Sequence, residues 1–218
     1  AAGRRVGRFV CGADMKKLIP TAAAVILVFA LIPHKLMAEK GMSEKERQEA
    51  MQKTMEAAQP GKEHEFLKQL EGKWKVRAKF WDKPGSEPMT TDWVSDGEMI
   101  LGGRFLQMKS SLVSAEEPGE ILTIFGFDRR FGKHTMVAFD TWGTYFVVSE
   151  GKYNPKTKTV TYHGEDYDPF GDFTQKWRTE MKIADRNTLH IALYFTDDVL
   201  SQGQDEFKMM EMDYERVK

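Results

Sequence analysis

The residues that could carry acid–base or metal chemistry are few and scattered in this chain. Of its five histidines, His34 lies in an apolar N-terminal segment, and the other four have no His-x-x-x-His or cysteine-based ligand spacing: His64, His134, His163 and His190. The chain also has no Gly-x-Ser-x-Gly motif, phosphate loop or dinucleotide fingerprint. We therefore predict no metal site, no cofactor and no catalytic residue.

One short run, His163-Gly164-Glu165-Asp166, does combine a base with two acids. Side chains alternate between the two faces of a strand. Because Val160 and Tyr162 form the better buried set, we expect His163 to face water, and His190 is expected to face water for the same reason. Four aspartates lie at expected strand ends or turns, where they ordinarily cap backbone amides: Asp128, Asp140, Asp166 and Asp168. A pair of carboxylates for acid–base work stays open as an alternative.

Aromatic side chains spread over many strands are more suggestive of function. The expected ligand-binding residues are Trp93, Phe105, Phe125, Phe139, Trp177 and Tyr214. Such rings can line a ligand cavity in a barrel of eight or more strands, or they can simply pack its core. Flexible methionines near the C-terminus would make part of such a wall adaptable to different ligands.

The elements that position these side chains begin at the stretch Leu70 to Trp81. From Lys73 to Phe80 it alternates strictly, with Trp74, Val76 and Ala78 on one face and basic residues on the other, which is typical of a half-buried strand. Further strands are predicted at residues 90–100, 104–113, 120–128, 134–141, 144–152, 158–166, 173–184, 188–196 and 206–216. Turn-forming Gly, Pro, Asn and Asp separate them.

About ten strands with hairpin-length connections predict an all-β antiparallel meander. Closure or near-closure into a barrel removes the two unpaired edges, and a β-sandwich is the alternative. One or two short helices should precede the barrel, because Ser43 to Ala58 begins with a capping box and Glu63 to Leu70 has one apolar side. The first helix either docks loosely or binds a partner.

The first and last strands should meet. In the last strand Arg216 shares a face with Met210, Met212 and Tyr214, so its guanidinium can stack on Trp74 if the barrel closes. Gly72, Trp74 and Arg216 are therefore the expected structural keystone; otherwise Arg216 simply reaches solvent.

The motif Gly72-Lys73-Trp74 resembles the Gly-x-Trp signature of lipocalin-like (calycin) barrels, and Tyr214-Glu215-Arg216 matches the arginine that such barrels place against it. More specifically, residues 60 to 218 resemble DUF1579, an uncharacterised bacterial family. The segments that carry this resemblance are Pro60 to His64, Leu70 to Trp74, Leu101 to Leu106, Gly126 to Asp128, Gly164-Glu165 with Asp168-Pro169, and Tyr214 to Arg216. The resemblance implies a calycin-like barrel and brings no agreed activity or catalytic residue with it.

The N-terminal region predicts export. Met15-Lys16-Lys17 precedes an apolar run from Leu18 to Ile32, and Ala38 follows at a suitable distance for signal cleavage. The expected divisions are a non-native or untranslated leader (1–14), a signal peptide (15–38), a helical extension (39–60) and the lipocalin-like barrel (61–218). The apolar run is short for a membrane span, although retention as an anchor is the alternative. The predicted location is periplasmic or secreted.

Cleavage after Ala38 would change the charge and the cysteine content. It removes six basic residues, one acidic residue and the single cysteine, Cys11, and leaves 26 basic and 32 acidic residues. The mature chain could then form no disulfide. An acidic exported protein without a clustered basic face is a poor candidate for binding nucleic acid.

Three functions remain in view. The first is a binding module that holds a small apolar or amphipathic ligand without catalysis. The second is a hydrolase or isomerase with a polar cluster at the barrel mouth, which a His–carboxylate pair would favour. The third is a structural or partner-binding protein, which an exposed apolar patch would favour. Haem ligation through an inward histidine rests only on analogy of fold.

Overall fold

A computed structural model describes residues 41–114 and 118–218. The predicted leader and signal peptide lie outside these residues. The chain divides into two units, which within the described residues are 41–54 and 55–218. Helix α2 (Glu44–Ala57) begins in the first unit, where Ser43 precedes it. The Ser43 backbone N–H donates to Glu46 Oε2 at 2.8 Å, and Ser43 Oγ accepts from the Glu46 amide. The predicted capping box is therefore present.

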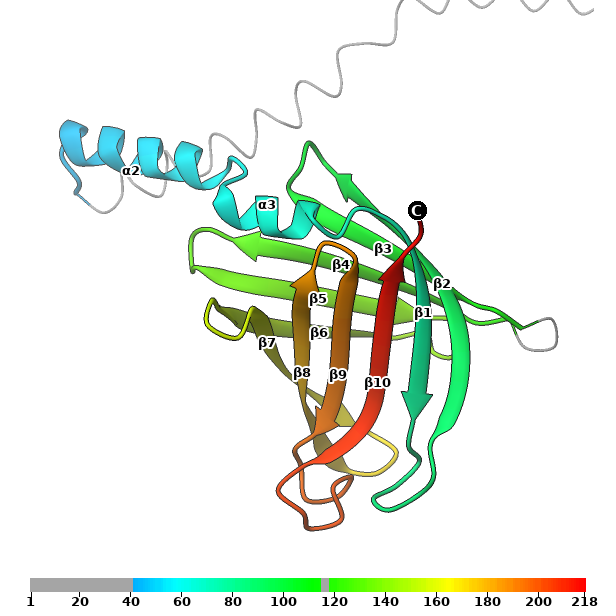
Figure 1. Cartoon of the computed structure of the whole chain (residues 1–218). Helices are drawn as coiled ribbons and strands as arrows, with labels where there is room; N and C mark the ends of the chain where they lie inside the picture. The colour runs from blue at the N-terminus through cyan, green and yellow to red at the C-terminus, as the bar shows by residue number, and fades with distance from the viewer. Residues whose placement is uncertain (1–40, 115–117) are drawn as a thin grey trace, which may run out of the picture. The chain divides into compact units, whose positions relative to one another are not determined.

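The second unit contains helix α3 (Lys62–Lys68) and ten strands (Figure 1). The strands are β1 (Gly72–Phe80), β2 (Met89–Ile100), β3 (Phe105–Leu112), β4 (Glu120–Asp128), β5 (Lys133–Asp140), β6 (Phe146–Asn154), β7 (Thr159–Asp168), β8 (Phe173–Asp185), β9 (Thr188–Phe195) and β10 (Phe207–Arg216). Every neighbouring pair is antiparallel, and β10 pairs with β1, so the sheet is a closed barrel. The predicted all-β meander barrel is confirmed.

The core fills the inside of the barrel with apolar side chains from alternate positions of the strands. In β1 the burial alternates as expected, with Trp74, Val76 and Ala78 inside. Helix α3 packs against β2, β3 and β4 and buries Leu67 at this end of the barrel. The other end is formed by the hairpins that follow β1, β3, β5, β7 and β9 (Figure 1), and we call it the open end.

The seam between β1 and β10 is continuous. Seven residue pairs run from Trp74↔Arg216 to Phe80↔Met210. The Arg216 guanidinium carbon lies 4.1 Å from the centre of the Trp74 ring, and the Trp74 indole donates to the Leu70 carbonyl at 3.0 Å. Arg216 also donates to the carbonyls of Glu71, Gln69 and Arg186.

Gly72 allows the chain to enter this seam. Its φ is +105°, a conformation that favours glycine, and an added Cβ would lie 3.0 Å from Arg216 Nη1. Arg216 therefore lies close to both other expected keystone residues, Gly72 and Trp74, because the register of the barrel brings the first and last strands together.

Candidate functional site

The ladder between β6 and β7 is shorter than its neighbours. Their register covers Glu150↔His163 to Asn154↔Thr159, whereas β7 and β8 stay paired as far as Asp168↔Phe173. Beyond Glu150 and His163, β6 and β7 separate toward the open end. A cleft with a volume of about 450 Å³ lies at this separation, and we call it the β6–β7 cleft.

The floor of the cleft is formed by a side chain from β8. The Trp177 indole is 5 % exposed and donates to Ser149 Oγ of β6 at 2.8 Å. Its ring lies against Gly164 of β7, because an added Cβ there would come within 2.5 Å of the indole. Trp177 thus bridges β6 and β7 from inside the barrel, at the level where backbone pairing has stopped.

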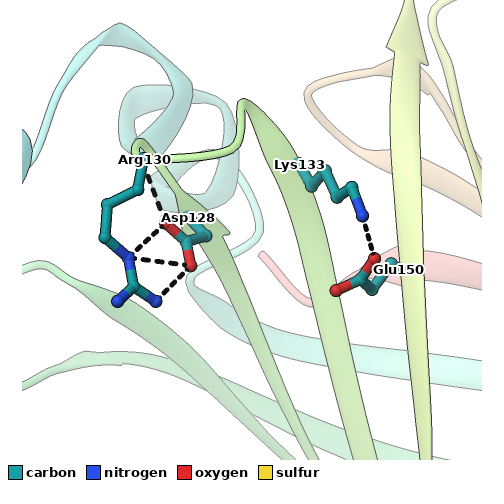
Figure 2. Close-up of polar contacts among 4 residues, drawn as sticks. All are labelled: Asp128, Arg130, Lys133 and Glu150. Carbon is teal, nitrogen blue, oxygen red and sulfur yellow. Dashed lines mark hydrogen bonds and ion pairs between the residues drawn. The ribbon is translucent and has the colours of Figure 1, made fainter.

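The rim of the cleft is polar and carries both signs of charge. It includes Glu150, His163, Glu165 and Lys176. Figure 2 shows Glu150 paired with Lys133 of β5. An apolar floor below a polar rim suits an amphipathic molecule better than a hydrocarbon or a highly charged ligand.

Three buried polar atoms lie deeper in the barrel and have no hydrogen-bond partner: His134 Nδ1, Tyr162 OH and Thr179 Oγ1. Burial lowers the pKa of His134 to about 4 and raises that of Tyr162. His134 is therefore neutral near pH 7. Sequence reasoning did not predict that His134 is buried, because β5 has apolar residues on both faces and its inward face was ambiguous.

Helix α3 brings a second histidine close to His134. His64 Nδ1 accepts from the Gly61 amide at 3.0 Å, and both histidines pack edge-on against the Phe127 ring. Burial lowers the pKa of His64 as well. In residues 41–114 and 118–218, no group of three or more His, Cys, Asp or Glu side chains could hold a metal ion.

The six predicted ligand-binding residues do not lie together. Trp93, Phe125, Trp177 and Tyr214 are buried inside the barrel, and of these Trp177 lines the cleft. The expectation that Phe105 and Phe139 point inward is wrong. Phe105 covers Gly126 from outside, next to the Thr135 side chain, and Phe139 is 40 % exposed and packs on Phe146.

These two errors have different causes. Phe105 shares its face with Gln107 and Lys109, while Leu106 and Met108 are buried, so strict alternation would have placed it outside. Phe139 shares its face with Val137, which is as apolar as the inward Met136 and Ala138. Alternation could not distinguish the two faces of β5.

The outer surface of β4, β5 and β6 carries an apolar patch. Two rows of register neighbours form it: Leu122, Phe139 and Phe146, and Ile124, Val137 and Val148. Val148 also lines the β6–β7 cleft, so the patch continues to the edge of the cleft.

His163 and His190, the two histidines expected to face water, lie outside the barrel core. His163 is exposed on the rim of the cleft. His190 Nδ1 lies 2.8 Å from Asp213 Oδ1 on the outer wall, where both side chains are more than one-third exposed. This His–carboxylate pair has no neighbouring nucleophile among its register partners, which are Lys182 and Arg77.

Three of the four aspartates, Asp128, Asp140 and Asp168, cap turns, whereas Asp166 lies within β7. Asp128 accepts from the Arg130 amide and also pairs with the Arg130 guanidinium at 2.6 Å, as Figure 2 shows, and these hydrogen bonds lower its pKa. Asp140 accepts from the amides of Trp142 and Gly143, and Asp168 from those of Phe170 and Gly171. Asp166 accepts from the next amide in the chain.

Among the described residues, none of the helices has the length and apolar character of a membrane span.

No curated protein matches this chain. Among the solved structures that share its fold are two distant ones. Rv2717c from M. tuberculosis is 15 % identical, with a TM-score of 0.55 over 73 % of this chain and all of that one. The S-type phycobiliprotein lyase CPES from Guillardia theta is 11 % identical, with a TM-score of 0.50 over 76 % of this chain and 97 % of that one.

Both structures are too distant in sequence to show more than the barrel fold. The family comparison is decisive for ancestry, because residues 59–216 match the model of a family described as a protein of unknown function, DUF1579. The chain belongs to the DUF1579 family.

Proposed function

We propose that this protein binds a small, mostly apolar or amphipathic molecule at the β6–β7 cleft and does not transform it. The observation that carries the proposal is the cleft itself, where the β6–β7 ladder stops and the buried Trp177 indole becomes the floor. The apolar part of a ligand would pack on Trp177 and Gly164, and the polar rim would remain in water.

The chemistry of the cleft favours binding over catalysis. The Ser149 hydroxyl accepts from the Trp177 indole and has no base hydrogen-bonded to it, whereas a nucleophilic serine needs such a base. The fold resembles that of the S-type phycobiliprotein lyase CPES. This resemblance is consistent with a barrel that accommodates an organic ligand.

The test is titration of the purified protein with Nile red, a neutral fluorophore that brightens in apolar surroundings, followed by competition with fatty acids, isoprenoids and porphyrins. Trp177→Ala should weaken saturable binding by about tenfold or more, which corresponds to about 1.4 kcal/mol. Trp81→Ala is the matched control, since Trp81 packs under Lys208 near β10 and not at the cleft. Equal losses in both variants, or no saturable binding, would contradict the proposal.

We also propose that the chain is exported and that the mature protein begins at Glu39. The support is the order of a basic segment, an apolar run and Ala38 in the sequence. Mass analysis of the exported protein should find Glu39 at the N-terminus, and an N-terminus at Met15 would contradict this.

A further inference from the structure

The three buried polar atoms without a partner in the barrel lie at one level of its interior. The register pairs His134 with Gly151, Gly151 with Tyr162, and Tyr162 with Thr179. All are inward positions on four consecutive strands. Gly151 has no side chain, and an added Cβ there would lie 2.9 Å from Tyr162 Cδ1, so the tyrosine ring passes over the glycine.

Leaving these atoms without a partner is unfavourable. His134 is 3 % exposed, Tyr162 0 % and Thr179 3 %, and a buried polar group without a hydrogen bond costs about 1 to 3 kcal/mol. Native proteins keep few such groups, and each one points to a water, an ion or a functional role. Three on one row of inward positions are candidates for contact with a bound molecule.

This level lies directly below the floor of the cleft. Gly164 and Trp177 form the next inward pair along β7 and β8 toward the open end, which is a distance of about 7 Å for two residues of strand. A molecule that passes from the cleft to this level must displace the indole from Ser149 Oγ. The serine hydroxyl then becomes a further hydrogen-bonding group for the molecule.

The residues around His134, Tyr162 and Thr179 disfavour a charged ligand group. The inward neighbours of this level on β4 to β8 are uncharged: Phe125, Met136, Ser149, Val160, Trp177 and Met181. An ionised group buried here would have no countercharge, and such burial costs several kcal/mol. A carbonyl or hydroxyl group, by contrast, can pair with neutral donors and acceptors.

We infer that His134, Tyr162 and Thr179 form a subsite for the uncharged polar group, such as a ketone, ester or alcohol, of an otherwise apolar ligand. This inference rests on the proposed ligand-binding function and goes further by naming the chemical class of the ligand. The unpaired hydroxyls are a cost to the empty protein that binding removes.

The experiment compares 2-decanone, decane and decanoate at pH 8 as competitors of Nile red. Wild type should bind 2-decanone more tightly than decanoate. Tyr162→Phe and Thr179→Val should each weaken the binding of 2-decanone by about tenfold, the loss of one good hydrogen bond, and leave decane unaffected. The thermal midpoint of the empty protein should rise by about 2 to 4 °C in each variant.

Thr159→Val is the matched control, because the Thr159 hydroxyl is buried but already donates to the Thr157 carbonyl at 3.2 Å. It should lower the midpoint and leave the affinity for 2-decanone unchanged. If Tyr162→Phe and Thr179→Val lower the thermal midpoint, a trapped water satisfies the hydroxyls and the inference is wrong. The inference is also wrong if the two variants weaken the binding of decane and of 2-decanone equally. Nile red binding by wild type would still uphold the proposed function in that case, whereas its absence would remove both.

Discussion

The β1–β10 seam and the β6–β7 cleft show two ways in which neighbouring strands of one barrel meet. The first joins the two ends of the barrel sequence through seven residue pairs. The second joins strands connected by a short turn, yet only five pairs form before they separate. Closeness in sequence therefore does not determine how far two strands stay paired.

The difference lies in the inward side chains. At the seam, Trp74 fills the interior and its indole N–H is satisfied by a carbonyl. At the cleft the inward residues of β6 and β7 are small, namely Ser149 and Gly164, and the Trp177 ring of β8 covers them. The β1–β10 seam is closed by side chains of its own strands. The β6–β7 cleft is covered by the Trp177 ring of a neighbouring strand, so moving that ring would open it.

The largest expected effect is at the seam. Trp74→Ala should lower the free energy of unfolding by about 3 to 5 kcal/mol, because it leaves a cavity at a buried ring and removes the support of Arg216. Chemical denaturation measures this directly. A loss below about 1 kcal/mol would mean that the seam does not depend on this residue.

The next effect concerns His134, a buried histidine whose Nδ1 has no hydrogen-bond partner. The pKa of His134 is lowered from 6.5 to about 4 in the folded protein, so the unfolded chain takes up a proton first as the pH falls. The free energy of unfolding therefore falls as the pH drops from about 6.5 to 4, and the loss due to His134 reaches about 2 kcal/mol by pH 5. The charged or titratable groups of α3 that act on His134 are Glu63, which raises its pKa, and His64, which lowers it.

Denaturation of wild type and His134→Leu at pH 7 and pH 5 tests this expectation. The variant should lose less stability than wild type over that interval. Identical losses would show that His134 is protonated in the folded state, or has a partner that relieves its burial.

A smaller effect tests whether the two strands of the seam are coupled through Trp74 and Arg216, which face each other at one end of it. Arg216→Ala should cost less than Trp74→Ala, and a double-mutant cycle should give a coupling energy of about 0.5 to 2 kcal/mol, the range of a cation–π contact. Strict additivity would imply that the stacked geometry contributes nothing to closure.

The smallest effect is at the cleft. Trp177→Phe keeps a ring over Gly164 but loses the hydrogen bond to Ser149, so it should cost about 0.5 to 1.5 kcal/mol. Amide hydrogen exchange should accelerate in residues 146–149 and change little in β1. Faster exchange throughout the barrel would contradict a local role for this bond.

Much of the fold followed from local patterns. The strict alternation of Lys73 to Phe80 predicted a half-buried strand, turn residues separated the other strands, and the placement of Arg216 on the apolar face of the last strand predicted its contact with Trp74. These inferences hold because each depends on neighbours in the chain and on the need to pair every edge of a sheet. The helix cap at Ser43 was equally local.

The candidate site did not follow from such patterns. Whether Phe139 or Met136 points inward depends on which face of β5 the barrel closes around, and both faces are apolar. The meeting of His134, Tyr162 and Thr179 depends on the register of four strands, which no single strand encodes.

Alternation and turn chemistry are properties of short segments, so they were enough to predict the strands, their order and the contact of Arg216 with Trp74. The position of the cleft and the identity of the polar groups without partners depend instead on the assembled barrel. The reason is that a one-residue shift in register exchanges the inner and outer faces of a strand, so the contents of the interior are set by all ten pairings together.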